Sequence, residues 1–449
     1  VIETNGAGLA TMSDAALEAI RKLNDREPSL FVRSGKLCRV SVDDEGVPSM
    51  QFTDGPILRG LLARCAVWVS TSSKRGQVEV LPPTAVADDL AALPYYDGLP
   101  TLRGIASAPI LSASGSLALK DGYDAGSGYY LASGCGWEVA KKSGKDAARW
   151  LMDEVLCDFP FQSEADKANA LALMVLPFVR PAIDGPTPLH LADAPTMGTG
   201  KSMLVKVCLY PFLGHEAMAT AAPSDEEEWR KKILAGLIAG WPAMFIDNIN
   251  RRIDSAALAG AITSPSWGDR VLGSNTTVTL PVRLVWAGTA NNVQLSVDLA
   301  RRSVWIRLDA QVERPWQREG FKHSDLFGWM RDNRTEIVAN ILAMIAEWLR
   351  KDRPKWSEKP LGSFENYCRV VGGILESCEV NGYLDNWEQM FESTNSDEES
   401  WKGLYERWWE IHKGDPVKAG DVYELAKDDE NLVGVLGDKG EQSQKIRLG

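Results

Sequence analysis

A glycine-rich segment of the sequence has the residue types and spacing that bind nucleotide phosphates. Residues 194–202 read Ala-Pro-Thr-Met-Gly-Thr-Gly-Lys-Ser and follow the apolar run Pro188 to Ala192. After a strand, small residues let backbone N–H groups surround phosphate oxygens, and the next helix adds its positive end. Pro195 stands where the usual pattern has its first glycine, so other parts of the chain must support this prediction.

The predicted loop supplies most of an ATP and Mg²⁺ site. Lys201 would reach the β- and γ-phosphates, and the Ser202 hydroxyl would bind Mg²⁺. The predicted nucleotide-binding residues are Pro195, Gly198, Thr199, Gly200, Lys201 and Ser202.

A carboxylate that could share the metal ends a second apolar run. Asp247 follows Met244-Phe245-Ile246 and lies 46 residues after Lys201. Phosphate-loop enzymes deliver such an acid to the Mg²⁺ shell at the end of a buried strand. By itself an Asp at a strand end is often only a cap, but after a Gly-Lys-Ser loop we predict a metal ligand.

The residues that could activate the attacking water differ in their chemistry. Asn248 follows Asp247 where ATPases usually carry Glu; its amide cannot accept a proton but can orient a water. A base could instead come from residues 226–228, with Glu228 the candidate. Ser224 and Glu227 also fit a capping box, and acids favour the first turn of a helix, so capping remains an alternative.

Two further polar groups follow later strands. Asn291 ends the run Val285 to Ala290 and could contact the γ-phosphate region, although Asn also ends strands because it tolerates turns. Arg301 and Arg302 precede the amphipathic run 303–308. This pair is either a solvated surface or an arginine finger that reaches a neighbouring subunit's nucleotide, with Arg302 the preferred finger.

The order of phosphate loop, Asp strand, Asn strand and Arg resembles AAA+ ATPases. More narrowly, it resembles superfamily 3-type hexameric helicases, in the form of the helicase module of phage and mobile-element primase-helicases. The similarity covers about 185–385. The segments that carry it are Phe245-Ile246-Asp247-Asn248-Ile249, Asp269-Arg270-Val271-Leu272-Gly273, Thr289-Ala290-Asn291-Asn292, Arg301-Arg302, Glu313-Arg314-Pro315, Phe321-Lys322-His323 and Gly362-Ser363-Phe364-Glu365.

The resemblance implies a hexameric ATPase that translocates on single-stranded or forked DNA during phage or plasmid-type replication. ATP would lie between subunits, with Lys201, Asp247, Asn248 and Asn291 on one side and Arg302 on the other. It also implies an upstream primase or polymerase domain, a longer chain than one starting at Val1, and a cytoplasmic location in a bacterial host.

In such helicases a hairpin before the Asn strand grips DNA in the central pore. Residues 270–281 read as two short strands around a polar tip. The candidate DNA contacts are Arg270, Asn275, Thr276 and Arg251. A plain hairpin packed on its own domain is the alternative, and Arg251 with Arg252 could equally form a solvated face.

The elements needed to position these residues follow from the alternation of apolar runs. Strands are predicted at 187–192, 217–222, 243–247, 282–287 and 303–308, with helices at 201–212, 225–239 and 254–263 between them. Strands alternating with helices indicate an α/β fold with a mostly parallel sheet. With the resemblance, this predicts an AAA+ P-loop core.

Flanking regions complete the predicted organisation. An N-terminal α+β domain is predicted at 1–143, with a helix at 14–24 capped by Ser13 and a hairpin over 30–42. The ATPase core would occupy 144–315, beginning with helical residues 144–180. The core is followed by a helical subdomain at 316–400, which includes a polar linker at 392–400. The predicted last part is a truncated winged-helix-like end at 401–449.

Composition narrows the functional classes. The 449 residues are 45% hydrophobic and 24% charged, which suits a globular protein. No window is apolar enough for a membrane span. The net charge of −12 argues against a surface covered with phosphate contacts but permits DNA in an internal channel. Seven Cys without a metal-like cluster indicate reduced thiols.

Three rival functions remain open on the sequence alone. An AAA+ machine that remodels protein assemblies would carry an aromatic pore loop. Trp267 is an aromatic residue near the predicted hairpin, so this alternative stays open. A small-molecule kinase would need Arg residues in a lid within one subunit. A nucleotide-switched structural protein would suit the slow hydrolysis that Asn248 suggests.

Overall fold

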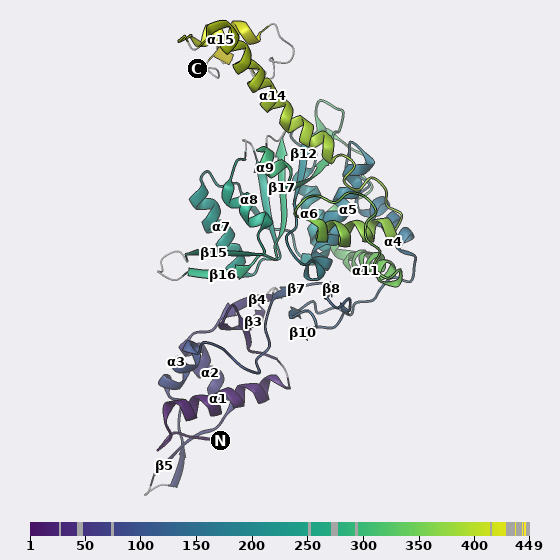
Figure 1. Cartoon of the computed structure of the whole chain (residues 1–449). Helices are drawn as coiled ribbons and strands as arrows, with labels where there is room; N and C mark the ends of the chain where they lie inside the picture. The colour runs from purple at the N-terminus through teal and green to yellow at the C-terminus, as the bar shows by residue number, and fades with distance from the viewer. Residues whose placement is uncertain are drawn as a thin grey trace.

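Five parallel strands form the central sheet in the computed structural model (Figure 1). Their order is β13, β14, β17, β12 and β18. These strands are β12 (Leu189–Ala194), β13 (Ala219–Ala221), β14 (Ala243–Ile249), β17 (Val285–Asn291) and β18 (Ser303–Arg307). β12 is buried along its whole length, as a strand covered on both faces must be. The predicted mostly parallel α/β sheet is confirmed.

Helices connect and cover these strands. They are α5 (Glu164–Val179), α6 (Lys201–Leu213), α7 (Glu226–Ala239), α8 (Ala256–Thr263) and α9 (Val297–Ala300). The predicted helical stretch 144–180 consists of separate helices: α4 (Gly144–Trp150) passes into a π-helix (Leu151–Val155), and α5 begins at Glu164. Ser163 caps α5 by accepting a hydrogen bond from the Asp166 N–H.

A helical layer packs beside the sheet and shares its core. It comprises α10 (Leu326–Asp332), α11 (Arg334–Arg350), α12 (Glu365–Tyr367) and α13 (Gly373–Ser377). Within the region 316–400, predicted to be helical, α10 and α11 meet at Asn333. One continuous set of buried apolar residues runs from Ala106 to Leu384. The division of the chain at 143, 315 and 400 stays a prediction.

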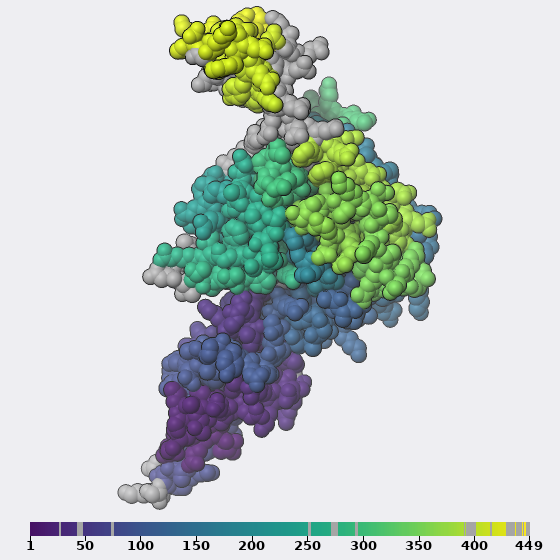
Figure 2. Space-filling view, viewed as in Figure 1, coloured from purple at the N-terminus to yellow at the C-terminus, as the bar shows by residue number. Residues whose placement is uncertain are grey.

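The N-terminal part has its own core and lies below the rest of the molecule as drawn in Figures 1 and 2. It contains β1 (Ile2–Glu3), α1 (Leu9–Asn24), β2 (Phe31–Arg33), β3 (Lys36–Val42), β4 (Pro48–Phe52), α2 (Gly55–Cys65), β5 (Trp68–Ser72), β6 (Gly76–Glu79) and α3 (Thr84–Ala92). The hairpin turns at Ser34 and Gly35, both with positive φ. The cap predicted at Ser13 is wrong, because α1 begins at Leu9 and Ser13 is buried inside it.

Short strands join this N-terminal part to the central sheet. They are β7 (Gly104–Ala106), β8 (Ile110–Leu111), β9 (Leu117–Ala118), β10 (Gly122–Asp124) and β11 (Tyr129–Leu131). Ala106 and Leu131 are buried in the large core with α5. The junction therefore couples the N-terminal part to the amino edge of the sheet.

The C-terminal end leaves the main body on a long helix. α14 (Trp387–His412) runs through residues 392–400, so this segment is helical, and its role as a linker stays a prediction. α14 and α15 (Ala419–Ala426) share a small core with Leu404, Ala426 and Leu436. The winged-helix-like end stays a prediction.

The structure describes residues 1–26, 28–42, 48–72, 76–249, 253–270, 277–291, 295–413 and 415–427, together with 436, 442, 444 and 445. Side chains at 390 and 392–400 are not described. Within this part of the chain, no helix is long and apolar enough to cross a membrane.

Candidate functional site

The predicted phosphate loop joins β12 to α6 at the carboxyl edge of the sheet. β12 ends at Ala194, and α6 begins at Lys201 with Gly200 as its N-cap. Gly198 (φ 77°) and Gly200 (φ 95°) adopt the left-handed backbone that glycine accommodates best. Pro195 has no positive φ, so its position does not need a glycine for backbone reasons. This explains how the loop forms despite the missing first glycine.

The Lys201 ammonium is held inside the loop. Its Nζ donates to the Asn291 Oδ1 at 2.7 Å, the Thr196 carbonyl oxygen at 3.1 Å and the Thr199 Oγ1 at 3.2 Å. The residue is buried, and burial lowers the pKa of the Lys201 ammonium, opposed by the negative charges of Asp193 and Asp247. The structure thus brings together two predicted residues, Lys201 and Asn291, that are 90 positions apart.

Ser202 and Asp247 are also in direct contact. The Ser202 hydroxyl donates to the Asp247 Oδ1 at 2.6 Å. A hydroxyl and a carboxylate are hard oxygen ligands of the kind that Mg²⁺ prefers, completed in phosphate-loop enzymes by phosphate oxygens and waters. In the described part of the chain, no group of three or more His, Cys, Asp and Glu residues could hold a metal ion. The pair therefore fits a magnesium bound largely by nucleotide and water, not by a protein cage.

Thr289 is a site residue that the sequence reasoning missed. Its hydroxyl is buried on β17, donates to the Asp247 Oδ1 at 2.5 Å, and accepts a hydrogen bond from the Asn248 N–H at 2.8 Å. β17 lies between β12 and β14, so Thr289 reaches across to the acid. The signal available in the sequence was only its place two residues before Asn291.

Asn248 lies at an irregularity of β14. The pairing of β14 with β17 shifts register between Ile246 and Ile249, and Asn248 has φ 55°. Asn tolerates this left-handed conformation better than most residues. Its side chain is exposed beside Asp247. The bulge therefore presents an amide, not a carboxylate, next to the proposed metal position.

A buried ion pair lies behind the loop and was also missed. Asp193 on β12 is fully buried, and its Oδ2 accepts a hydrogen bond from the Arg307 Nη1 at 2.7 Å. The Arg307 guanidinium also lies 5.2 Å from the Trp305 ring. Since Asp193 stands just before the loop, this pair fixes β18 against the strand that carries the phosphate site.

Aromatic residues contact the loop glycines. A Cβ added at Gly198 would lie 3.1 Å from the Trp316 Cβ, and one added at Gly200 would lie 3.7 Å from the Phe159 ring. Trp316 is 62% exposed, although it contacts the loop. No motif marked Trp316, since it lies 115 residues after Lys201 and reaches the loop only through the fold.

The acidic run at the start of α7 has mostly structural partners. Asp225 is the N-cap and accepts from the Glu228 N–H at 2.9 Å, so the capping box predicted from Ser224 is wrong. The Glu226 Oε2 accepts from the Ala257 N–H at the start of α8. Glu228 forms an ion pair with Lys231 at 2.9 Å. The structure does not bring Glu228 into contact with the loop, and its role as a base stays a prediction.

Arg302 lies at the opposite edge of the sheet from the loop. Its carbonyl accepts from the Leu189 N–H at the start of β12, five residues before the loop strand ends. At about 3.3 Å per residue this places Arg302 roughly 17 Å from the loop. Arg301 and Arg302 both form ion pairs with Asp298. Arg302 is therefore remote from the predicted phosphate loop of its own chain.

The predicted hairpin exists but begins earlier than expected. β15 (Ser266–Arg270) pairs with β16 (Thr277–Pro281), and Asp269 forms two hydrogen bonds with Arg230 of α7. Arg270 ends β15 next to the tip. Of the other predicted DNA contacts, Asn275, Thr276 and Arg251 lie outside the described residues.

Comparisons with known proteins give weak similarities. No family profile and no curated protein matches the chain. An apo structure of the C-terminal region of NrS-1 is 11% identical, with a TM-score of 0.43, over 96% of this chain and 90% of that chain. The active helicase Cch of SCCmec type IV is 12% identical, with a TM-score of 0.38, over 92% of this chain and 90% of that chain. We therefore derive a function from this chain's own residues.

Proposed function

We propose that this protein is an ATP-dependent DNA helicase or translocase with an AAA+ type of ATPase core. The observation that carries the ATPase part is the convergence of Lys201, Ser202, Asp247 and Asn291 at one edge of the sheet. These side chains come from three separate segments and meet directly after a loop with two left-handed glycines. Such convergence supports a site for a nucleoside triphosphate.

Each of these residues has a different role in phosphate transfer. Lys201 binds phosphate oxygens in place of its present acceptors, and Ser202 and Asp247 hold Mg²⁺. The metal supplies charge neutralisation at the β- and γ-phosphates. Asn291 and Asn248 orient the attacking water through their amide groups. Because neither amide accepts a proton, the proton must leave to another acceptor, for which Glu228 remains the candidate on this chain.

The position of Arg302 supports an oligomer. A finger at the edge remote from its own loop serves catalysis only by reaching a neighbouring subunit. Asp298 holds the Arg302 guanidinium, and the two arginines lower the pKa of the Asp298 carboxyl. We propose a ring, with six subunits as the resemblance implies, in which Arg302 approaches the partner's γ-phosphate.

The hairpin supports DNA as the translocated polymer. Alternate residues of β15 and β16 are exposed, so the hairpin presents backbone and polar side chains outward. Polar side chains and backbone N–H groups are adequate phosphate contacts. Trp267 is only half-exposed and packs against α8, where its ring lies near Gly260. An aromatic loop for gripping protein is therefore not formed by Trp267, which disfavours a protein-remodelling machine.

The test combines ATP hydrolysis, particle mass and strand displacement. We expect hydrolysis that single-stranded DNA stimulates, a particle of several subunits, and loss of hydrolysis and strand displacement in a folded Lys201→Ala variant. The matched control is Lys206→Ala on the same helix, whose ammonium pairs with Glu216 and not with the loop. Hydrolysis by a stable monomer without DNA stimulation would refute the helicase and leave an ATPase of another kind.

A further inference from the structure

A small cationic pocket lies at the amino edge of the sheet, where the N-terminal part meets the core. Four arginines line it: Arg33 from β2, Arg103 before β7, Arg180 after α5 and Arg283 before β17. Of the described residues that line the pocket, none is Asp or Glu. This pocket is separate from the phosphate loop, which lies at the carboxyl edge of the same sheet.

The two innermost guanidinium groups are buried and only partly satisfied. Arg180 donates to the carbonyl oxygens of Ile183, Gly185 and Val282 at 3.0–3.1 Å, while its Nε has no hydrogen-bond partner. Arg33 donates to the Leu237 carbonyl oxygen at 2.9 Å and to the Arg103 carbonyl oxygen at 3.5 Å, and its Nε also lacks a partner. Each guanidinium has five N–H donors. Buried donors without acceptors are uncommon and often mark a missing water or ion.

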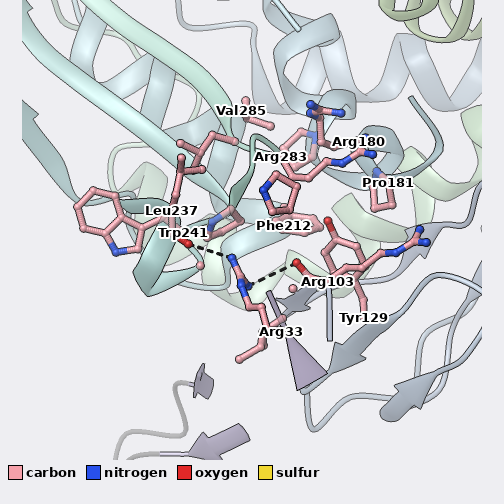
Figure 3. A pocket seen from close by; sticks show the side chains of 17 residues that line it. Arg33, Arg103, Tyr129, Arg180, Pro181, Phe212, Leu237, Trp241, Arg283 and Val285 are labelled. Carbon is pink, nitrogen blue, oxygen red and sulfur yellow. Dashed lines mark hydrogen bonds between the residues drawn. The ribbon is translucent and has the colours of Figure 1, made fainter. Parts of the chain in front are cut away.

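The other groups around the pocket reinforce its positive field. Burial and the nearby Arg283 lower the pKa of the Arg180 guanidinium to about 10. The fully buried Tyr129 hydroxyl has a raised pKa because of burial, opposed by the charges of all four arginines. Figure 3 shows Arg180 and Arg283 next to one another above the Tyr129 ring, with Arg33 reaching the pocket from another side. The Asp184 carboxylate partly offsets this field at Arg180, and four like charges held close together favour a further counter-charge.

We propose that this pocket binds a phosphate-type oxyanion, supplied either as free phosphate or as a phosphodiester group of nucleic acid. Planar guanidinium groups match such oxygens through paired N–H donors. The cavity volume of about 30 Å³ is about twice what one water needs, so it has room for a small polar group and not for a nucleobase.

The pocket also has an accessible side. Arg33 and Arg180 are buried, Arg283 is half-buried, and Arg103 is exposed. An anion would therefore enter past Arg103 and Arg283 and contact the deeper donors. Because the residues come from the N-terminal part and from the core, the bound anion would join the two. This inference does not depend on the proposed ATPase activity.

The first arm of the test measures binding of inorganic phosphate in the Lys201→Ala chain, which weakens the competing phosphate loop. Thermal unfolding is followed with phosphate against chloride at constant ionic strength. We expect phosphate to raise the midpoint, since a ligand of the folded state stabilises it. The double variant Arg103→Ala with Arg283→Ala should bind at least tenfold more weakly. The control is Arg331→Ala with Arg350→Ala, which removes two exposed arginines elsewhere.

The second arm measures binding of a single-stranded oligonucleotide as salt is raised. If the pocket holds a phosphodiester, loss of two arginines should reduce the slope of log K against log salt by about 1.4. A phosphate effect supports free phosphate, and a slope effect without it supports the nucleic acid. If the double variant should unfold, Arg103→Ala alone serves both arms, because its side chain is exposed. Equal behaviour of pocket and control variants in both arms would overturn the proposal and leave the arginines as caps of backbone carbonyls.

Discussion

Replacing Thr289 by Val removes one hydroxyl from the centre of the candidate site and nearly preserves side-chain volume. The hydroxyl donates to the Asp247 Oδ1 at 2.5 Å and accepts from the Asn248 N–H at 2.8 Å. The variant leaves the carboxylate with one donor fewer and the bulge N–H without its acceptor. Thr289 is a positioning residue, since it acts through Asp247.

The expected losses of stability and of kcat follow from these two hydrogen bonds. A hydrogen bond to a charged group contributes about 1.5–3 kcal/mol, and an orphaned buried donor costs about 1–3 kcal/mol. Because Asn248 is exposed, water can replace part of the hydrogen bond that its N–H loses. We expect the free energy of unfolding to fall by about 2–4 kcal/mol. If the first bond sets the position of the acid, kcat falls by about 10- to 150-fold.

The assay pairs urea unfolding with ATP hydrolysis over a range of Mg²⁺ concentrations. Thr289→Val should need more Mg²⁺ for half-maximal rate, which a purely structural role would not change. Thr289→Ser is the matched control, because it keeps both hydrogen bonds and loses one methyl, about 1 kcal/mol. The positioning role of Thr289 is refuted if Thr289→Val keeps the wild-type kcat and Mg²⁺ dependence, or if Thr289→Ser is as impaired as Thr289→Val.

Three further outcomes are expected. Arg302→Ala should retain ATP binding and lose at least 10³-fold in kcat. Mixing Arg302→Ala subunits with Lys201→Ala subunits should restore some hydrolysis. No recovery in the mixed particles would contradict an arginine finger that acts in trans. Gly198→Ala should weaken nucleotide binding and lower the unfolding midpoint, because φ is 77° and the new Cβ would lie 3.1 Å from Trp316; unchanged affinity measured by titration calorimetry would count against the loop geometry. Burial lowers the pKa of His190 to about 3 from 6.5, so the unfolded chain binds the proton first. Stability should therefore fall below pH 6.5 by about 1.4 kcal/mol per pH unit, and His190→Gln should flatten this fall in urea titrations at pH 7 and 5.5.

Much of the candidate site could be predicted because each residue ends or begins a strongly patterned segment. Lys201 follows two glycines, and Asp247 and Asn291 each end an apolar strand. Since parallel strands present their carboxyl ends at one edge, these residues had to converge if the strands were neighbours. The observed contact of Lys201 with Asn291 agrees with this expectation.

The errors arose where local signals competed. Ser13, Ser224 and Asp225 are all acceptable caps by residue type, and only packing decides which one begins a helix. The polar composition of residues 392–400 gave no sign of a helix, but α14 continues through them. Helix ends are decided by small free-energy differences, so tertiary contacts shift them readily.

The sequence by itself predicted a nucleotide-binding loop and determined the alternation of strands and helices, because glycine spacing and apolar periodicity act over short stretches of chain. Only the tertiary structure decided which side chains share a site. Thr289 reaches Asp247 because β17 lies between β12 and β14. The four arginines of the cationic pocket come from segments up to 250 residues apart, and no local pattern links them. Strand order and domain packing are global consequences of burying apolar surface, so they place such residues together without leaving a motif.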